Sequence, residues 1–527
     1  MRSICALRDR FAPIVVSGLT FLAPAVPAQD MPTATGQVPR FEPAPCPKLP
    51  GADELAKASC GYLVVLEDRS RPTGRTIRLL VAKYPARSPE KRADPVVYLA
   101  GGPGDIAPLE VNGLVAGDFI RDRDIVVVSQ RGTMFSEPAL TCAPTDDFAR
   151  ELLSLRFYSA ATERAHLAAT EACHRELAAT GADLSAYNST ESAADFADLR
   201  KVLGIAAWNV YGTSYGSYLA QTLIRDHPDG IRSVVLDSVL PTTYTIPGTW
   251  PITGAGFDNH FHACAAETAC NAAHPHLEET FTRLVNKLEA EPLTTTVSDP
   301  ATGGDVKVVL DGGALVDWLR NQNYAVPLLK AAPNRIDGLA ARRADSVEAI
   351  AKDRAGRAPP PGPDVPALGY GLSYGVSCRE DYPFATQADL AAAGRQAFPD
   401  YPASIQGEGV GGWAYINQDC HDVWKVPAAP EAMRQPGRQQ HSDAPHLWQL
   451  RHVDVTCRGG GRGRKAVKSD DHQHSRHRAC RGTSIAVRPG GHHIIPHRSE
   501  HPRHILRRDF EATHLHPFLT RWRKVGL

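Results

Sequence analysis

Two kinds of segment alternate in the first half of the chain. In one kind, apolar residues occupy every second position or follow one another without a break. In the other kind, apolar residues recur at the spacing of a helix. The segments "GYLVVLED" (61–68) and "TIRLLVAKYP" (76–85) predict a pair of early strands. The short runs "DPVVYLA" (94–100) and "DIVVVSQ" (124–130) are rich in β-branched residues, as strands inside a sheet are. This part of the chain therefore predicts a sheet whose central strands are buried on both faces.

The next hundred residues continue the alternation. Helical spacing in "SAADFADLRKVLG" (192–204) is followed by the strand-like "WNVY" (208–211), a helix over 217–230 that ends at Pro and Gly, and the strand-like "IRSVVLDSV" (231–239). Strands that alternate with helices favour a mainly parallel α/β sheet.

After residue 241 the pattern becomes helical and irregular, as expected for a lid inserted into an α/β core. We therefore divide the chain into a signal peptide (1–28), the first part of the core (45–241), a mainly helical lid (242–428) and the position of the last part of the core (429–527).

The stretch "GTSYGSYLA", which begins at Gly212, lies between the predicted strand and the predicted helix. A nucleophile elbow requires a strand, a very tight turn and a helix, with glycines on both sides of the serine. Ser214 is thus the candidate nucleophile, and the backbone N–H of Tyr215 would face the developing oxyanion. A second Gly-x-Ser-x-Gly match centres on Ser373, but no buried-strand pattern precedes it, so we prefer Ser214.

Two further motifs follow strands. In "YLAGGPGDIA", Gly101 and Gly102 lie in a glycine-rich turn that can present backbone N–H groups to a carbonyl oxygen and complete an oxyanion hole. By itself such a turn is also typical of an ordinary loop. Gln130, Arg131 and Gly132 end the next strand.

These motifs, in this order, resemble the α/β-hydrolase fold and, more narrowly, the secreted tripeptidyl aminopeptidase and proline iminopeptidase family. The resemblance spans roughly Cys46 to Cys420 and rests on "GGPG", "QRG…S.P.L.C", "YNSTESAADFADLR" and "WNVYGTSYGSYLA". Ala100 stands where many relatives have His, and Ser129 where many have Asp. Neither position belongs to the catalytic triad. These departures therefore put in question which subgroup of the family the chain resembles, and not the reaction that the triad would catalyse.

The resemblance implies an acid in a pattern like S-G-x-x-D, and a histidine about thirty residues later in a pattern like P-G-x-G-H. Neither pattern follows Pro436, so the triad Asp and His are not present at the family positions. His492 and His493, in "RPGGHHII", match only superficially. Residues 1–436 carry 40 Lys and Arg against 51 Asp and Glu, whereas residues 437–527 carry 18 against 7 and hold 13 of the 21 histidines.

A slip of the reading frame would explain why the excess of acidic residues before residue 437 changes to an excess of basic residues after it. Read one base out of register, the codons for 437–454 are compatible with V-V-S-N-I-P-T-L-L-I-S-G-S-F-D-M-L-T, and those for 473–481 with S-I-P-G-I-G-H-V. Both missing motifs then reappear in order. We hypothesise one extra base or two missing bases near Pro436, so that the tail is aberrant from about residue 437. A natural basic tail that binds an acidic surface or nucleic acid is the alternative.

The N-terminus has the features of a secretory signal peptide. Arg2, Arg8 and Arg10 precede an apolar segment that is short for a membrane span, and small residues allow cleavage after Ala28. We therefore expect a secreted or periplasmic protein without a membrane span once the signal is removed.

Export permits disulfides. Eight cysteines lie between the signal and the charge step, and the simplest pairing joins 46 to 60, 142 to 173, 264 to 270 and 378 to 420. Spacing alone leaves other pairings open. Zinc binding is disfavoured because no pair has Cys-x-x-Cys spacing.

The resemblance implies an exported serine hydrolase that releases residues from peptide N-termini, using Ser214 and the backbone N–H groups of Gly101, Gly102 and Tyr215. We expect no cofactor, no metal and no nucleic-acid partner, and a peptide or a small ester as substrate. A carboxylesterase is the nearest enzymatic alternative. In a different class, the chain as written is an inactive remnant that lacks the acid and the base.

Overall fold

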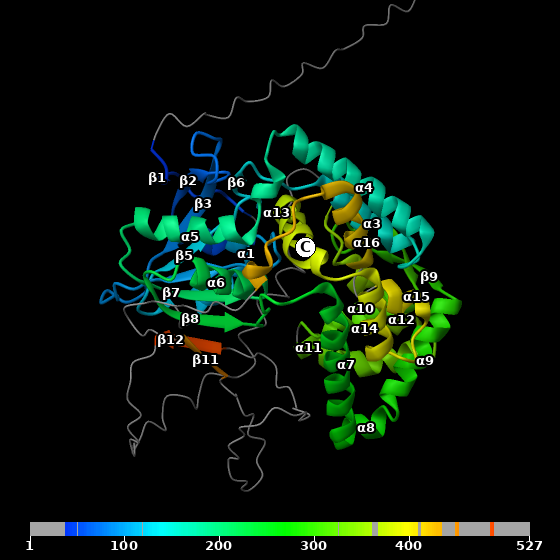
Figure 1. The fold of residues 1–527 in the computed structure, drawn as a ribbon. Coiled ribbons are helices and arrows are strands. Elements are labelled where there is room, and N and C mark those ends of the chain that lie inside the picture. The colour runs from blue at the N-terminus through cyan, green and yellow to red at the C-terminus, as the bar shows by residue number, and fades with distance from the viewer. Residues whose placement is uncertain are drawn as a thin grey trace, which may run out of the picture.

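The structure is a computed structural model that describes residues 37–49, 51–117, 120–324, 326–360, 367–408, 413–434, 448–452 and 485–489. The predicted signal peptide and most of the tail after Pro436, including His492 and His493, lie outside the described residues. Figure 1 shows a twisted sheet with helices on its faces, next to a largely helical lid.

The sheet runs in the order β1-β2-β3-β5-β4-β7-β8-β12-β11, and a two-residue strand, β6, pairs with β3. Its strands are β1 (Arg40–Pro43), β2 (Ser59–Leu66), β3 (Thr76–Tyr84), β4 (Val96–Leu99), β5 (Ile125–Val128), β6 (Ser136–Glu137), β7 (Trp208–Thr213), β8 (Ile231–Asp237), β11 (Trp448–His452) and β12 (Ile485–Pro489). β1, β2, β3 and β5 pair antiparallel, whereas β5, β4, β7 and β8 pair parallel. The predicted early strand pair and the four later strands are confirmed.

Alternate residues of the central strands pack against different helices. On one face, Val97, Val126 and Val210 contact the layer formed by α5 (Ser189–Val202) and α6 (Tyr215–Asp226). On the other face, Tyr98 and Val127 pack against the segment that holds α1 (Ala107–Glu110) and α2 (Asn112–Ala116). All four residues of β4 and of β5 are buried, because each strand lies between two neighbours and under helices on both faces.

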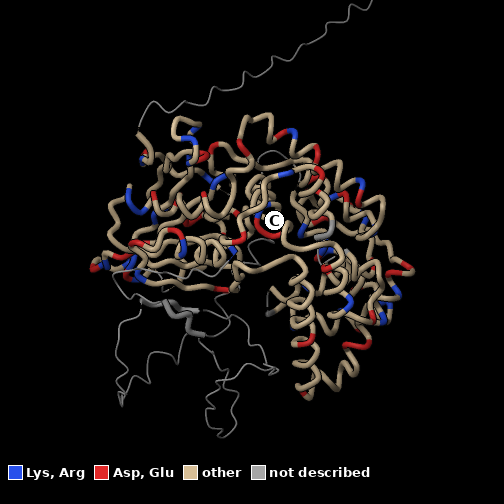
Figure 2. Tube along the Cα trace, in the orientation of Figure 1, with Lys and Arg blue, Asp and Glu red and all other residues tan. Residues whose placement is uncertain are grey.

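Residues after β8 form a mainly helical region, which we call the lid. Its helices are α7 (Thr249–Ala266), α8 (Thr268–Ala273), α9 (Leu277–Ala290), α10 (Gly312–Gln322), α11 (Val326–Ala340), α12 (Ala344–Ala355), α13 (Tyr370–Val376), α14 (Gln387–Ala397), α15 (Ala403–Glu408) and α16 (Trp413–Asp419). It has an aromatic core that includes Trp250, Phe257 and Trp318. Sequence analysis missed one hairpin in it, β9 (Leu293–Ser298) with β10 (Asp305–Leu310). Acidic and basic residues are interspersed over both the sheet part and the lid (Figure 2).

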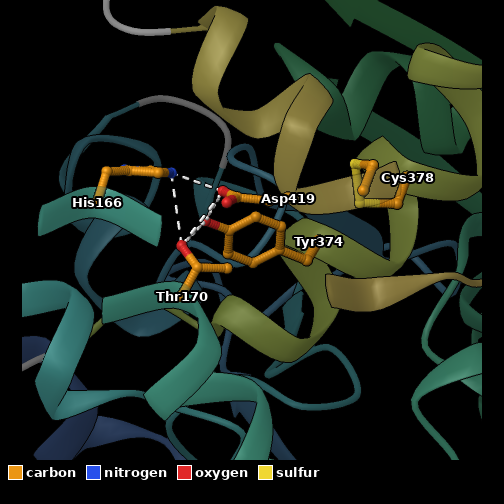
Figure 3. Close-up of a disulfide and its surroundings, with 6 residues drawn as sticks. His166, Thr170, Tyr374, Cys378 and Asp419 are labelled. Atoms are coloured by element: carbon orange, nitrogen blue, oxygen red, sulfur yellow. Dashed lines mark hydrogen bonds and ion pairs between the residues drawn. A yellow bond between two sulfur atoms is a disulfide. The ribbon is translucent and has the colours of Figure 1, made fainter. Parts of the chain in front are cut away.

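Two helices that precede α5 in the chain also contact the lid. They are α3 (Ala143–Glu151) and α4 (Ala160–Ala179). His166 and Thr170 of α4 both hydrogen-bond to Asp419 at the end of α16, and Tyr374 of α13 donates to the same carboxylate (Figure 3). The lid therefore has an anchor on a helix far away in the sequence.

Short helical turns complete the described elements. They are η1 (Asp53–Lys57), η3 (Leu152–Ser154), η4 (Leu184–Ala186), η5 (Ile246–Gly248), η6 (Ser377–Asp381), η7 (Tyr382–Phe384), η9 (Cys420–Trp424) and η10 (Glu431–Arg434).

All four disulfides predicted from the order of the cysteines are present: Cys46–Cys60, Cys142–Cys173, Cys264–Cys270 and Cys378–Cys420. The last one joins η6 to η9 within the lid. In the part of the chain that the structure describes, no helix combines the length and the apolar character needed to cross a bilayer.

Two short strands are described after Pro436. β12 pairs with β8 through residues 485–487, and β11 pairs with β12. Both pairings are antiparallel and thus do not continue the parallel order of β4, β7 and β8.

Candidate active site

Ser214 lies on a sharp turn between β7 and α6. Its backbone has φ 55° and ψ −121°, a strained conformation for a residue with a side chain. The turn leaves Ser214 exposed, while the next residue, Tyr215, is buried. The Ser214 N–H donates to the carbonyl oxygen of Asp237 at the end of β8, 3.0 Å away. The serine is thus presented at the carboxyl ends of the parallel strands, as a nucleophile elbow requires.

Two glycines make the elbow sterically possible. A Cβ on Gly212 would lie 2.2 Å from the carbonyl oxygen of Gly216, and a Cβ on Gly216 would lie 2.0 Å from that of Leu99. Both distances are far below van der Waals contact, so α6 begins close to β7 and β4 only because these positions lack side chains. This explains both glycines of the Gly-x-Ser-x-Gly motif.

The predicted oxyanion turn lies next to the elbow. A Cβ on Gly101 would be 3.4 Å from the Cβ of Ser214, and Gly102 has φ +100° and is exposed. The structure separates the predicted donors, because the Gly101 N–H donates to Oε2 of Glu110 at 3.1 Å. Gly102 and Tyr215 therefore remain as the candidate pair of oxyanion donors.

The lid packs directly on this turn. The Gly369 N–H, just before α13, donates to the carbonyl oxygen of Gly104, 2.9 Å away. A Cβ on Gly104 would lie 2.7 Å from the carbonyl oxygen of Gly369. The glycine-rich turn is therefore held between the core and the start of α13.

The Gln-Arg-Gly motif has a structural role. Arg131 has no exposed side-chain surface and forms a double hydrogen bond with Asp195 of α5, with both N···O distances 2.8 Å. It also donates to the carbonyl oxygens of Glu67 and Ala186. Gln130 donates to the carbonyl oxygen of Ala100, immediately before the oxyanion turn. The motif thus joins α5, β2 and the turn.

Buried acidic residues of the lid lie next to the elbow helix. The Tyr215 hydroxyl hydrogen-bonds to Ser189, whose backbone N–H donates to Oε1 of Glu380 at 2.8 Å. Burial raises the pKa of Glu380. Burial also raises the pKa of Asp381 well above its usual value, and the neighbouring Glu380 raises it further. The lid therefore places two acidic residues next to the starts of α5 and α6.

The rival serine does not lie on an elbow. Ser373 is inside α13, and its N–H donates to the carbonyl oxygen of Gly369. Gly371 and Gly375 allow α13 to pack closely on Leu140 and on the backbone of Tyr187. This second motif is therefore a helix-packing feature.

Within the described residues, no hydrogen bond joins Ser214 to a histidine. The described residues also contain no group of three or more His, Cys, Asp or Glu side chains arranged to hold a metal ion.

Comparison with known proteins agrees with the topology and the elbow. A family model described as the alpha/beta hydrolase fold matches residues 94–327, which contain the oxyanion turn, the elbow and the start of the lid. The chain has the α/β-hydrolase fold.

Curated relatives are peptidases by name. The serine protease Hip1 of Mycobacterium tuberculosis is 26% identical over 321 residues, covering 58% of this chain and 59% of the relative. The tripeptidyl aminopeptidase of Streptomyces coelicolor is 28% identical over 192 residues, covering 34% of this chain and 35% of the relative. The chain thus spans about three fifths of the length of Hip1 and a third of that of the aminopeptidase.

A solved α/β hydrolase from Novosphingobium aromaticivorans matches 49% of this chain and 69% of its own, with 16% identity and a TM-score of 0.24. The strand order, the elbow and the family model identify the fold.

Sequence analysis missed one group beside the oxyanion turn. Glu110 accepts the Gly101 N–H and the Tyr98 hydroxyl, and it hydrogen-bonds to Asp105. Two acidic residues within the otherwise apolar stretch "GGPGDIAPLE" are the sequence signal that could have drawn attention to it.

Proposed function

We propose that this protein is an exported serine hydrolase that releases residues from the N-termini of peptides. The observation that carries the proposal is the strained, exposed Ser214 beside a glycine-rich turn, in a chain whose relatives are named peptidases. Four disulfides are consistent with export, because such bonds persist in oxidising compartments.

In this mechanism the Ser214 hydroxyl attacks the scissile carbonyl carbon. The oxyanion that forms is held by the backbone N–H groups of Gly102 and Tyr215, the latter at the start of α6. A histidine accepts the serine proton and later donates it to the leaving amine, while an aspartate orients that histidine. Water then hydrolyses the acyl-enzyme. No cofactor or metal takes part in this scheme.

The histidine and the aspartate are proposed to lie in the alternative reading frame after Pro436. Its codons allow S-G-S-F-D, with the Asp across the codons of 451 and 452, and P-G-I-G-H, with the His across those of 479 and 480. The slip can lie in the gene or only in the sequence as determined. If the frame is correct as written, the chain is a remnant whose residual catalysis would come from binding and the oxyanion hole.

Nucleotide sequencing across the codons for 430–445 tests the frame. A frame-restored chain and the chain as written are then compared with a fluorophosphonate probe. We expect the restored chain to label at Ser214, and Ser214→Ala to abolish labelling while the matched Ser373→Ala leaves it unchanged. Restored chain that stays soluble and unlabelled would contradict the proposal.

Substrate assays then separate the peptidase from the esterase. An aminopeptidase cleaves peptides with a free N-terminus and loses activity when that amine is acetylated. An enzyme that hydrolyses small esters and neither peptide form would be a carboxylesterase, which uses the same triad.

A further inference from the structure

A chain of hydrogen bonds crosses the sheet directly under the elbow. Glu110 accepts from the Tyr98 hydroxyl at 2.7 Å, and Tyr98 also hydrogen-bonds to Thr213, the residue before the nucleophile. Thr213 hydrogen-bonds to Tyr211, whose hydroxyl donates to Asp237 of β8 at 2.6 Å. The chain thus connects the ends of β4, β7 and β8 with the last residue of α1.

Glu110, the first residue of this hydrogen-bond chain, also binds the oxyanion turn. Oε2 of Glu110 accepts the Gly101 N–H at 3.1 Å, so one carboxyl oxygen binds both the turn and β4. Asp105 comes just after the turn, and its Oδ2 lies 3.2 Å from the position of a Gly101 Cβ, a point that is 3.4 Å from the Ser214 Cβ. The two carboxyl groups are therefore close to the reacting serine.

Asp105 and Glu110 hydrogen-bond to each other. A carboxylate only accepts hydrogen bonds, so two carboxyl groups in such contact must keep a proton between them. Burial raises the pKa of Glu110 well above its usual value, and the charge of Asp105 raises it further. Glu110 is therefore the group that holds the proton and donates to Asp105.

We propose that Glu110 is a positioning residue of the hydrolytic site, which uses its shared proton with Asp105 to fix the glycine-rich turn at the distance from Ser214 that oxyanion binding requires. The role rests on the proposed function, because it acts through Gly101 and the turn and not on the substrate itself. Loss of the proton would place two carboxylates in contact, and their repulsion would move the turn.

Among the described groups of this hydrogen-bond chain, none supplies a compensating positive charge. Tyr98 and Tyr211 have pKa values raised by burial and stay neutral, and Asp237 at the far end of the hydrogen-bond chain is itself acidic. We therefore expect the reactivity of Ser214 to fall at alkaline pH, because the Asp105–Glu110 pair loses its shared proton there.

The test uses the frame-restored full-length chain and two variants of it, Glu110→Gln and Glu110→Ala. The side-chain amide introduced by Glu110→Gln can accept from Gly101 and donate to Asp105, so this variant retains the geometry without a titrating proton. The first readout is the rate of fluorophosphonate labelling of Ser214 against pH. We expect Glu110→Ala to slow labelling about tenfold or more, since small displacements at a reacting centre are costly. Glu110→Gln should restore the rate to within about twofold and remove the fall at alkaline pH.

A second readout does not need catalysis. Infrared spectra at pH 7 should show a stronger protonated-carboxyl band in the parent chain than in Glu110→Gln, and hydrogen exchange at residues 101–104 should be faster in Glu110→Ala alone. A frame-restored chain that never labels defeats the proposed function, while these two measurements still test the pair. A carboxyl band that is unchanged in Glu110→Gln, or equal labelling by Glu110→Ala and Glu110→Gln, would overturn the positioning role.

Discussion

Nε2 of His166 lies 2.6 Å from Oδ2 of Asp419, although the two residues are 253 positions apart. Asp419 is almost fully buried and also accepts hydrogen bonds from Thr170 and Tyr374 (Figure 3). The contact ties α4 to α16 next to the Cys378–Cys420 disulfide. It is therefore the anchor that holds the end of the lid against a helix from the first half of the chain.

His166→Ala should destabilise the fold, because it removes one of three donors from a buried carboxylate. We expect a loss of about 1–3 kcal/mol in the free energy of unfolding, measured by urea denaturation. Glu171→Ala, at an exposed position of the same helix, is the matched control and should change it by less than about 0.5 kcal/mol. Equal losses in the free energy of unfolding for the two variants would contradict the proposed role of His166 as an anchor of the lid.

Gly216→Ala should damage the elbow. The new methyl group would meet the carbonyl oxygen of Leu99 at 2.0 Å, and that oxygen belongs to the backbone of β4 and cannot rotate away. We expect a loss of about 1–3 kcal/mol by overpacking, together with loss of probe labelling at Ser214. A Cβ on Gly113 meets nothing within 4 Å, so Gly113→Ala is the control. Normal stability and labelling in Gly216→Ala would show that α6 can shift.

Arg131→Met should be among the most destabilising single changes. It leaves the buried carboxylate of Asp195 without its bidentate partner and removes donors from the carbonyl oxygens of Glu67 and Ala186. Breaking one side of a buried ion pair costs about 3–5 kcal/mol. Arg164→Met, at an exposed position of α4, is the control in the same denaturation experiment. A loss below about 1 kcal/mol would mean that Arg69, which also contacts Asp195, replaces the lost charge.

The buried carboxyl groups predict a pH dependence of stability. The folded-state pKa values of Asp105 and Glu110 are raised, so the folded protein binds more protons than the unfolded chain between the ordinary and the raised pKa. The contribution of this pair to the free energy of unfolding should therefore be greatest below the ordinary carboxyl pKa and be lost as pH rises through that window.

Glu110→Gln removes the group with the larger shift. Its stability should consequently fall less steeply with pH than that of the parent chain, when both are measured by denaturation from pH 4 to pH 9. Glu380 and Asp381 also have raised pKa values, so a slope should remain in the variant. Identical slopes would show that Glu110 does not hold the proton in the folded state.

The sequence by itself determined the features that have a local signature. Continuous β-branched runs predicted β4 and β5, because strands buried on both faces need apolar residues at every position. The order strand, Gly-x-Ser-x-Gly, helix distinguished Ser214 from Ser373, because only the first serine follows a buried strand. The cysteine order yielded all four disulfides. The β9–β10 hairpin was missed, since the exposed residues in both of its strands are mostly polar.

Only the tertiary structure decided which side chains meet across the fold. Nothing near Glu110 in the sequence shows that it accepts the Gly101 N–H and the Tyr98 hydroxyl, and nothing near Asp419 indicates a bond to His166. Periodicity reports which face of an element is buried, whereas a polar contact depends on how distant elements are packed. Burial then gives these contacts their strength, because a polar group removed from water needs a partner in the protein.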